Sequence, residues 1–363
     1  MRKTLVVDWL DLYGGAEKVI AVLYEELKFE EIWCLIDIMS QSEKNRLFGT
    51  PNVTIKQTSL RIFGKRFRFI FPLFPFFLEQ IKVDSKSEII VSSSHTATKG
   101  INKTSDSQIH ICYIQQRNLM YVWEDYERKL FFKKLAFLLR PALKLIEKKD
   151  YQLAQNPDFM IANSRFVQNW LKKRYNRESY LVYPPVDIEG FQFNAIKEDY
   201  YVTVGRFAIK KRFDLIIKAF NHLGKRLIVI GDGELNTELR LMASSNIEFT
   251  GFLPSDEVAE VISKAKGFVF AALEDFGIAP VEAQACGTPV ICLGQGGTAE
   301  TVQHKETGYL FHEQSVVSIC DAVVEFEKLV FDPYTIRKNA ERFSVARFKV
   351  EIQDVINKAI NNR

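Results

Sequence analysis

The feature that most constrains this chain is an alternation of short apolar runs with longer helical patterns along its whole length. In the first half, these runs predict strands at Thr4–Val7, Glu31–Ile36, Glu88–Ser92, Ile109–Tyr113, Phe159–Ala162 and Tyr180–Val182. In the second half, they predict strands at Tyr200–Val204, Arg226–Ile230, Ile247–Thr250, Gly267–Ala271, Pro289–Leu293 and Tyr309–Phe311. Strands that alternate with helices form parallel sheets covered by helices on both faces. The sequence therefore predicts an α/β fold.

One interruption divides this series into two halves. Two rigid prolines, Pro184 and Pro185, follow a predicted strand, and a polar stretch separates them from the next strand. A chain of 363 residues is also too long for a single ordinary core. We therefore predict two doubly wound, Rossmann-like domains, residues 1–183 and 184–343, which face each other across a ligand cleft. The last helix, within residues 344–363, is expected to pack back on the first domain.

Composition and charge argue against several classes of protein. The chain is 47% hydrophobic and 26% charged, which is typical of a folded soluble protein, and its net charge of +4 is too small to indicate a nucleic-acid partner. Its five cysteines include no C-x-x-C pair, so neither a disulfide framework nor a zinc site is indicated. The apolar run from Phe69 to Leu78 is too short to cross a bilayer, and the N-terminus does not resemble a signal peptide. We expect a cytoplasmic protein.

Strand ends in the second half place a cationic turn and a glycine turn at one edge of the predicted sheet. Arg206 follows the strand that ends at Val204, and Lys211 lies five residues later at the expected start of a helix. This turn is suited to bind a diphosphate, because phosphate oxygens attract cationic side chains. Gly231 and Gly233 end the next strand and permit a ligand to approach the backbone closely.

The most informative segment leads from a strand end into a helix whose N1 residue is predicted to be Pro280. Glu274 lies at the strand tip and Glu282 in the first helical turn. Carboxylates at these two places suit hydrogen bonds to the hydroxyls of a sugar and of a ribose. The free N–H groups between them would point at an anion, assisted by the helix dipole, and they belong to Gly277, Ile278 and Ala279.

These motifs resemble those of family-4 glycosyltransferases, which have the GT-B fold. The E-x7-E pattern of that family corresponds to Glu274 and Glu282, and the wider match comprises VGRFAIKKRFD, VIGDGE, FTGFLP, EDFGIAPVEAQACGTPVI and GGTAETV, in that order. The resemblance implies that Arg206 and Lys211 bind the donor phosphates and that Gly277–Ala279 hold the diphosphate. It assigns the ribose to Glu282 and the transferred sugar to Glu274. It also implies transfer with retention of anomeric configuration and without a metal ion.

The segment from Gly294 to Ala299 formally matches the G-x-G-x-x-A pattern of a dinucleotide-binding turn. It lies in the last βα unit of the second half, whereas such a fingerprint belongs to the first unit of its domain. We interpret it as another glycine turn that faces the same nucleotide-sugar.

Two turns of the first half are expected to face the cleft. Gly14 and Gly15 open a helix in a turn similar to the GGAE turn of the family, which lies near the donor phosphates and the acceptor. The stretch that contains His95 is similar to the SSSH-x-x-x-KG stretch of bacterial mannosyltransferase-like members involved in surface polysaccharide assembly. Those relatives usually carry a further histidine where this chain has Gln115. Glutamine can hydrogen-bond a sugar hydroxyl but cannot take up a proton near neutral pH.

Two segments of the first half are basic and rich in aromatic residues. Lys44 to Leu78 contains seven Lys and Arg residues and no acid, and Arg128 to Lys149 contains eight, with Glu147 as its one acid. Such segments suit attachment to an anionic inner leaflet, where each basic residue contributes about 1 kcal/mol. They are equally typical of core helices that carry solvated basic residues on their outer faces.

We therefore predict a glycosyltransferase in which four residues act in catalysis, namely Glu274, Arg206, Lys211 and His95. The expected donor is GDP-mannose, from the likeness around His95, with a UDP-sugar as the second candidate and with no cofactor or metal. The expected acceptor is a glycan or a lipid-linked one in surface polysaccharide or O-antigen (lipopolysaccharide) synthesis. Two other classes stay open: a nucleotide-sugar epimerase of the same fold, and a non-catalytic scaffold subunit of a polysaccharide assembly complex, which Gln115 favours.

Overall fold

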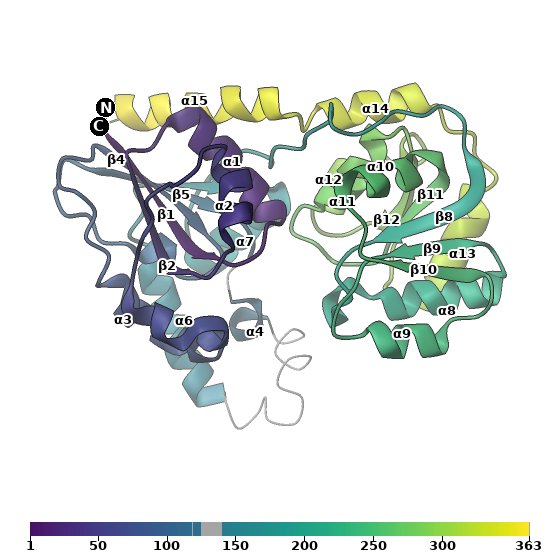
Figure 1. Ribbon diagram of the computed structural model, residues 1–363, viewed down its shortest axis with the longest axis horizontal. Coiled ribbons are helices and arrows are strands. Elements are labelled where there is room, and N and C mark those ends of the chain that lie inside the picture. The colour runs from purple at the N-terminus through teal and green to yellow at the C-terminus, as the bar shows by residue number, and fades with distance from the viewer. Residues whose placement is uncertain (118, 125–139, 363) are drawn as a thin grey trace. The chain divides into compact units, whose positions relative to one another are not determined.

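A computed structural model describes residues 1–117, 119–124 and 140–362 (Figure 1). The chain forms two compact units. Unit 1 comprises Met1–Tyr183 together with the chain from Phe348 onward, and unit 2 comprises Pro184–Arg347. Every predicted strand is present. The structure also contains a two-residue strand, β3 (Lys56–Gln57), which the sequence patterns did not indicate.

Unit 1 is built on a seven-stranded parallel sheet in the order β3-β2-β1-β4-β5-β6-β7. Its other strands are β1 (Lys3–Leu10), β2 (Glu31–Asp37), β4 (Ile89–Ser94), β5 (Ile109–Ile114), β6 (Phe159–Ala162) and β7 (Tyr180–Leu181). Its described helices are α1 (Gly15–Leu27), α2 (Gln41–Phe48), η1 (Ser59–Leu73), α3 (Phe74–Leu78), η2 (Thr98–Gly100), α4 (Met120–Trp123), α6 (Arg140–Leu153) and α7 (Arg165–Tyr175). Strands β4 and β5 are buried along their whole lengths, including Ser92, Ser93 and Ser94 of β4 and His110 of β5.

The C-terminal helix α15 (Val345–Asn361) packs on the core of unit 1. Phe348, Ile352 and Ile356 recur every four residues on one face and join the same buried cluster as residues of β1 and α1. An ion pair of 2.8 Å between Lys349 and Glu25 of α1 adds a contact at the edge of this face.

Unit 2 is built on a six-stranded parallel sheet in the order β10-β9-β8-β11-β12-β13. These strands are β8 (Glu198–Val204), β9 (Leu227–Ile230), β10 (Ile247–Gly251), β11 (Ala265–Phe270), β12 (Val290–Leu293) and β13 (Gly308–Phe311). The helices are η4 (Ile209–Lys211), α8 (Phe213–Leu223), α9 (Asn236–Met242), α10 (Ser255–Lys264), α11 (Ile278–Ala285), α12 (Thr298–Thr301), α13 (Val316–Phe326) and α14 (Pro333–Glu341). Two buried clusters cover the opposite faces of this sheet, as expected of a doubly wound domain.

Each sheet reverses its strand order at one place, between β1 and β4 in unit 1 and between β8 and β11 in unit 2. The loops that follow these strands diverge there and leave room for a ligand at the carboxyl edge of the sheet. No helix within the described parts of the chain is long and apolar enough to span a membrane.

Candidate functional site

The reversal point of unit 2 brings together two of the residues predicted to act in catalysis. Lys211 ends the short helix η4 after β8, and Glu274 lies in the loop after β11. The Lys211 Nζ atom is 2.7 Å from the Glu274 Oε1 atom, and both side chains are about 30% exposed (31% and 29%). The pair therefore spans the reversal point, with both charged groups in contact with solvent and within reach of a ligand.

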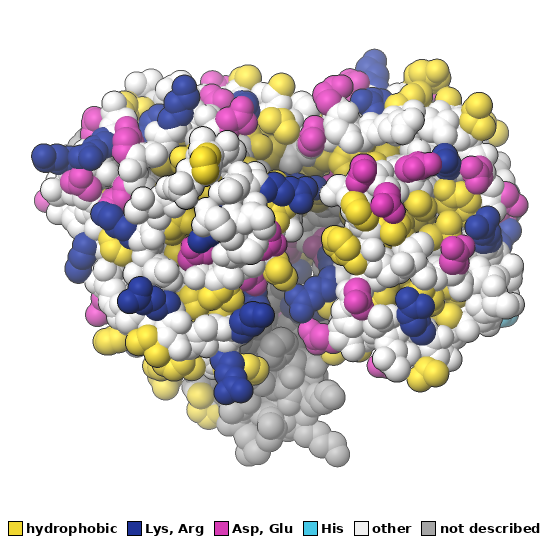
Figure 2. All heavy atoms as spheres, viewed as in Figure 1, with side chains coloured by type: hydrophobic (Ala, Val, Ile, Leu, Met, Phe, Trp, Pro, Cys, Tyr) yellow, Lys and Arg dark blue, Asp and Glu magenta, His cyan; other side chains and the backbone are white. Residues whose placement is uncertain are grey.

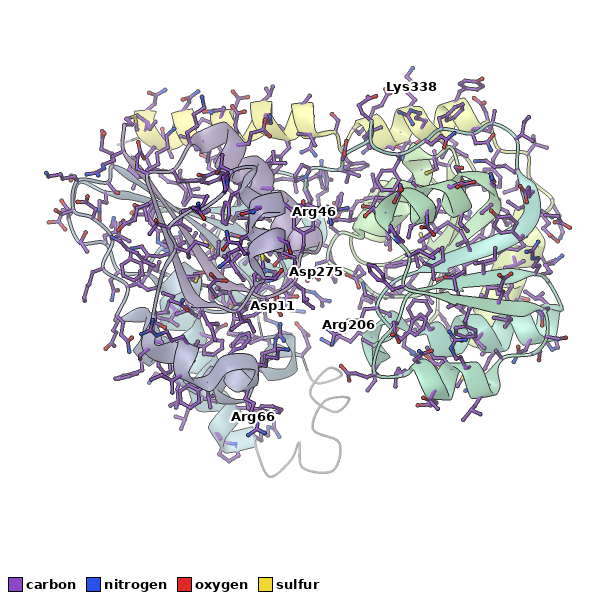
Figure 3. The ribbon with its side chains drawn as sticks, viewed as in Figure 1. Asp11, Arg46, Arg66, Arg206, Asp275 and Lys338 are labelled. Atoms are coloured by element: carbon purple, nitrogen blue, oxygen red, sulfur yellow. The ribbon has the colours of Figure 1, made fainter. Side chains whose placement is uncertain are left out.

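Arg206 lies in the same loop as Lys211 but is held differently. Its guanidinium is 3.3 Å from a carboxylate oxygen of Glu234, and both side chains are exposed. Figure 3 shows the Arg206 side chain extending away from the sheet of unit 2. An exposed ion pair of this kind contributes roughly 0–1 kcal/mol, so a diphosphate can replace Glu234 as the partner of Arg206 at little cost.

Helix α11 begins at Ile278, two residues earlier than predicted, with Gly277 as its N-cap at φ +88°. Pro280 is therefore the third helical residue and not N1, which corrects the sequence-based prediction. Proline is tolerated there because the N–H groups of a first helical turn have no partner within the helix. The N-cap residue Gly277 has no side chain that could cap this end. The N–H groups of Gly277, Ile278 and Ala279 thus lie where a helix favours an anion.

Glu282, the predicted ribose contact, is the fifth residue of α11 and lies half-buried just beyond the first turn. It therefore lies one turn further along the helix than the N–H groups at Gly277–Ala279. A side chain at this depth can contact a nucleoside whose diphosphate lies at the helix start.

The glycine turn at Gly294–Ala299 has a structural explanation within unit 2. The Gly297 N–H donates to the Glu274 carbonyl at 2.8 Å, and a Cβ on Gly297 would lie 2.3 Å from the Cα of Phe276. Only glycine permits this approach. The turn supports the loop that carries Glu274, and this packing accounts for its glycine without a contact to a ligand.

In unit 1, the predicted turn at Gly14 and Gly15 forms the start of α1, with Gly14 as its N-cap. The side chain of Glu17 turns back and accepts a hydrogen bond of 3.0 Å from the Gly14 N–H. Burial raises the pKa of Glu17 to about 7, so its charge changes near neutral pH. Glu17 had no predicted role, although a glutamate three residues after an N-cap is the signal of a capping box.

His95 follows β4 at the reversal point of unit 1. Its ring stacks on the indole of Trp9, with centroids 5.3 Å apart and planes 18° from parallel. Burial lowers the pKa of His95, so the imidazole is neutral at neutral pH. It can therefore act as a hydrogen-bond donor and acceptor, or as a base.

The turn that carries His95 is held by Asp8, a buried residue of β1 that the sequence analysis missed. Its carboxylate accepts hydrogen bonds from four consecutive backbone N–H groups, those of His95, Thr96, Ala97 and Thr98. The last three are 2.7–2.9 Å long. The available signal was a lone acid within the apolar strand sequence LVVDWL.

Gln115 follows β5, and hydrogen bonds hold it in place. Its side-chain amide donates to the Ser93 hydroxyl at 2.9 Å, and its backbone carbonyl accepts from the Asn163 side-chain amide at 2.7 Å. Among the described residues, no group of three or more His, Cys, Asp or Glu side chains is arranged to hold a metal ion.

This arrangement can be compared with known proteins. A sequence model of the family "Glycosyl transferases group 1" matches residues 188–343, which contain all the predicted donor-site residues of unit 2. Unit 2 is therefore similar to group 1 glycosyl transferases over residues 188–343. The predicted resemblance to family-4 glycosyltransferases is thereby confirmed.

Relatives at moderate identity match only part of this chain. An uncharacterized glycosyltransferase of Methanocaldococcus jannaschii is 27% identical over 194 residues, which are 52% of this chain and 55% of that protein. A GDP-mannose-dependent alpha-(1-6)-phosphatidylinositol monomannoside mannosyltransferase of Mycobacterium tuberculosis is 31% identical over 142 residues, which are 34% of this chain and 37% of that protein. The chain therefore spans about half or less of the length of these relatives.

Solved structures extend the likeness over both units. Anabaena HepE in complex with UDP superposes with a TM-score of 0.72 at 17% identity, covering 99% of this chain and 100% of that one. A sucrose-phosphate synthase from Thermosynechococcus elongatus gives a TM-score of 0.73 at 16% identity and covers all of both chains. These likenesses and the two parallel sheets confirm the predicted GT-B fold.

Proposed function

We propose that this protein transfers a sugar from a nucleotide-sugar to a glycan or lipid-linked acceptor, with retention of anomeric configuration. The observation that carries the proposal is the Lys211–Glu274 pair at the reversal point of unit 2, which matches the model of group 1 glycosyl transferases and in which α11 begins after a glycine N-cap. A cation and free N–H groups at one sheet edge suit a diphosphate, and the adjacent carboxylate suits a sugar hydroxyl.

In this proposal the donor binds unit 2. Arg206 and Lys211 stabilise the charge that grows on the leaving diphosphate, and the N–H groups at Gly277–Ala279 assist them. Glu274 orients the transferred sugar while Lys211 holds its carboxylate, and Glu282 contacts the ribose. Preorganised donors of this kind act most strongly on the transition state, because the negative charge is largest there.

The acceptor is assigned to unit 1, at the turns that carry Gly14, Gly15 and His95. A neutral imidazole beside Trp9 offers a sugar hydroxyl both a hydrogen-bond partner and an apolar ring to pack on. Gln115 adds a polar amide without a proton-accepting group. The leaving phosphate is then the group that takes up the acceptor proton.

GDP-mannose is the donor we favour and a UDP-sugar is the second candidate. The likeness around His95 and the GDP-mannose-dependent relative support the first, and the solved complex of HepE with UDP supports the second. Turnover of GDP- and UDP-sugars by the purified chain, with an added glycan acceptor, tests this choice. Transfer from one of them is expected, and an epimerised donor or no turnover at all would favour the epimerase or the scaffold subunit instead.

Transfer is also proposed to need no metal ion, as the resemblance implies. Pretreatment with EDTA should leave the rate of transfer unchanged to within experimental error. Loss of activity that returns with Mg²⁺ or Mn²⁺ would contradict this part of the proposal.

Synthesis of a surface polysaccharide such as O-antigen would place the enzyme at the inner leaflet, and unit 1 carries a surface suited to this. Segment η1 and helix α3 expose large apolar side chains, including Ile62 (80%), Phe69 (85%) and Phe76 (63%). Basic and apolar side chains lie together on the part of unit 1 over α3 and α6 (Figure 2). Of the second basic segment, Arg128 to Lys149, only residues 140–149 are described. We propose that this surface binds an anionic membrane.

The structure changes which basic residues are suited to that role. Arg68 forms an ion pair with Asp11, and its guanidinium lies 5.7 Å from the centroid of the Trp9 ring, on which His95 stacks. Lys65 and Arg66 are exposed, and Figure 3 shows Arg66 at the surface. Lys65 and Arg66 are therefore the better residues with which to test membrane binding.

A further inference from the structure

A cavity of about 210 Å³ lies on the flank of unit 1 that carries η1, α3 and α6. Phe71 and Phe74 line one side, and Ile146 and Leu153 of α6 line the other. Figure 1 draws α3 and α6 beside each other at this edge of unit 1. The cavity walls are thus mostly aromatic and aliphatic.

The inner end of the cavity is formed by the turn that carries the proposed acceptor residue. Thr96 and Ala97, which line it, directly follow His95 in the chain. Their backbone N–H groups are among those held by Asp8, so this end of the cavity is rigid. A ligand in the cavity would therefore lie against the same turn as the acceptor hydroxyl.

The buried carboxylate that lines the cavity, that of Asp150, already has hydrogen-bond partners within the protein. Asp150 is buried, and its Oδ1 atom accepts a hydrogen bond of 2.6 Å from Lys99. Its Oδ2 atom accepts from the Trp123 indole at 2.7 Å and from the Tyr175 hydroxyl at 2.5 Å. A polar ligand would have to break these bonds, and an apolar one would not. The cavity is therefore suited to hydrocarbon and not to a sugar.

The basic side chains at the cavity indicate which group is attached to the hydrocarbon chain of the ligand. Lys149 lines the cavity and is exposed, and Lys148 and Lys144 are exposed on the same helix. These cations suit a phosphate attached to the hydrocarbon. The volume is below the roughly 300–1,000 Å³ of sites that enclose a whole drug-sized ligand, so it fits one segment of a chain.

We propose that this cavity binds the hydrocarbon chain of a phosphate-linked lipid acceptor, and so presents the acceptor's sugar to the His95 turn. The inference rests on the proposed glycosyl transfer and names its acceptor class: an alkyl or prenyl chain joined through phosphate to the sugar. The exposed apolar side chains of η1 and α3 would receive the rest of the chain.

A bromine-labelled alkyl phosphate tests the cavity directly, because bromine on the chain quenches tryptophan fluorescence. Trp123 packs against the same buried cluster as the cavity residues Phe71 and Ile146. Leu145 lines the cavity but is 71% exposed, so Leu145→Glu places a carboxylate at its rim without disturbing the core. Leu241→Glu is the matched control, since Leu241 is 82% exposed on α9 of unit 2.

Wild type and Leu241→Glu should show saturable quenching, and Leu145→Glu should bind roughly tenfold or more weakly because its carboxylate repels the phosphate and disfavours the chain. Equal quenching of all three proteins, or quenching that does not saturate, would overturn the inference. Circular dichroism shows whether Leu145→Glu is folded, and Ile146→Phe, which fills the cavity with an apolar ring and adds no tryptophan to the assay, gives an independent loss of binding.

Activity measurements separate this inference from the proposed function. With a chain-free glycan acceptor, Leu145→Glu should keep the wild-type kcat/KM, while with an alkyl-phosphate-linked acceptor its KM should rise about tenfold. Absence of transfer by the wild type to either acceptor would refute the function itself. If Leu145→Glu weakened only binding to phospholipid vesicles, the cavity would hold a membrane lipid and the acceptor assignment would be wrong.

Discussion

The two sheets reverse their strand order at equivalent places, but the groups that occupy these places differ. In unit 1, four N–H groups after β4 converge on the Asp8 carboxylate, which belongs to the protein. In unit 2, the N-cap of α11 is a glycine without a side chain, and Lys211 pairs with Glu274, which precedes this helix in the chain. Unit 1 thus binds the N–H groups of its turn with its own carboxylate. The helix start of unit 2 together with Lys211, here called the open turn, is where we propose that the diphosphate binds.

This difference explains how one architecture can serve two kinds of substrate. In the proposed function, an anionic diphosphate is attracted to the open turn of unit 2, because a helix start and the cation of Lys211 both favour negative charge. In unit 1 the carboxylate of Asp8 would repel a phosphate, and the neutral His95 offers hydrogen bonds to an uncharged hydroxyl. In the proposed function, donor and acceptor are therefore separated by charge as well as by position in the chain.

The largest expected effect comes from removing the cation of unit 2. Lys211→Ala should lower kcat/KM for the nucleotide-sugar by about 10²–10³-fold, because it removes a charge that stabilises the leaving diphosphate and leaves Glu274 unpaired. Steady-state kinetics with Lys218→Ala, an exposed lysine of α8, provide the control. An unchanged kcat/KM would show that the open turn of unit 2 is not the donor site.

Loss of the Asp8 carboxylate is expected to lower the free energy of unfolding. Asp8→Asn keeps the shape of the side chain but loses its charge and half of its acceptors, so we expect unfolding to become easier by about 2–3 kcal/mol. Urea unfolding, compared with the exposed substitution Asp106→Asn, measures this. A wild-type free energy of unfolding would mean that the turn does not depend on Asp8, and the contrast between the units would fail.

Glu17 gives unit 1 a pH dependence of known sign. Its pKa in the folded state is raised from 4.5 to about 7. Between these two pH values the unfolded chain has lost this proton and the folded chain still holds it. The free energy of unfolding therefore falls as pH rises from about 4.5 to about 7. The loss amounts to about 3 kcal/mol at most. Glu17→Gln should therefore be more stable than wild type at pH 8 but not at pH 4.5, in unfolding curves at both pH values. A difference that is equal at the two values would contradict a raised pKa.

The smallest expected effect concerns the membrane-facing surface, which is a property of unit 1. Replacing Lys65 and Arg66 with Ser should weaken sedimentation with anionic liposomes by about 2 kcal/mol, or about 30-fold, at low salt and less at high salt. The control replaces Lys218 and Lys338 of unit 2, of which Lys338 is visible on the surface of α14 in Figure 3. Equal pelleting of the two double variants would favour the core-helix interpretation.

Much of the fold was predictable because strands and helices leave local signals. Each predicted strand is present, and the four-residue recurrence from Phe348 to Ile356 agrees with a helix that buries one face. The start of α11 was placed two residues late, because a positive φ at Gly277 lets the helix begin before Pro280. Strand β3 was missed because two residues are too short to show a period of two.

The site was only partly predictable. Sequence motifs indicated Arg206, Lys211 and Glu274 as donor-site residues, but not that Lys211 pairs with Glu274 while Arg206 faces Glu234. Glu17 was within a quoted motif without a role, and its raised pKa arises from burial. Burial depends on neighbours in space and therefore cannot be predicted from the residues next to Glu17 in the chain.

Three features could be recognised from the sequence: the two sets of alternating strands, the proline break between them and the motifs at the strand ends. Each of them depends on residues that lie close together in the chain. Which strand ends lie next to each other could be seen only in the tertiary structure. Asp8 reaches His95, Lys211 reaches Glu274, and Gly297 supports the loop of Glu274, all across long stretches of chain. Each contact depends on the order of strands in a sheet, and alternation of strands and helices is compatible with many orders.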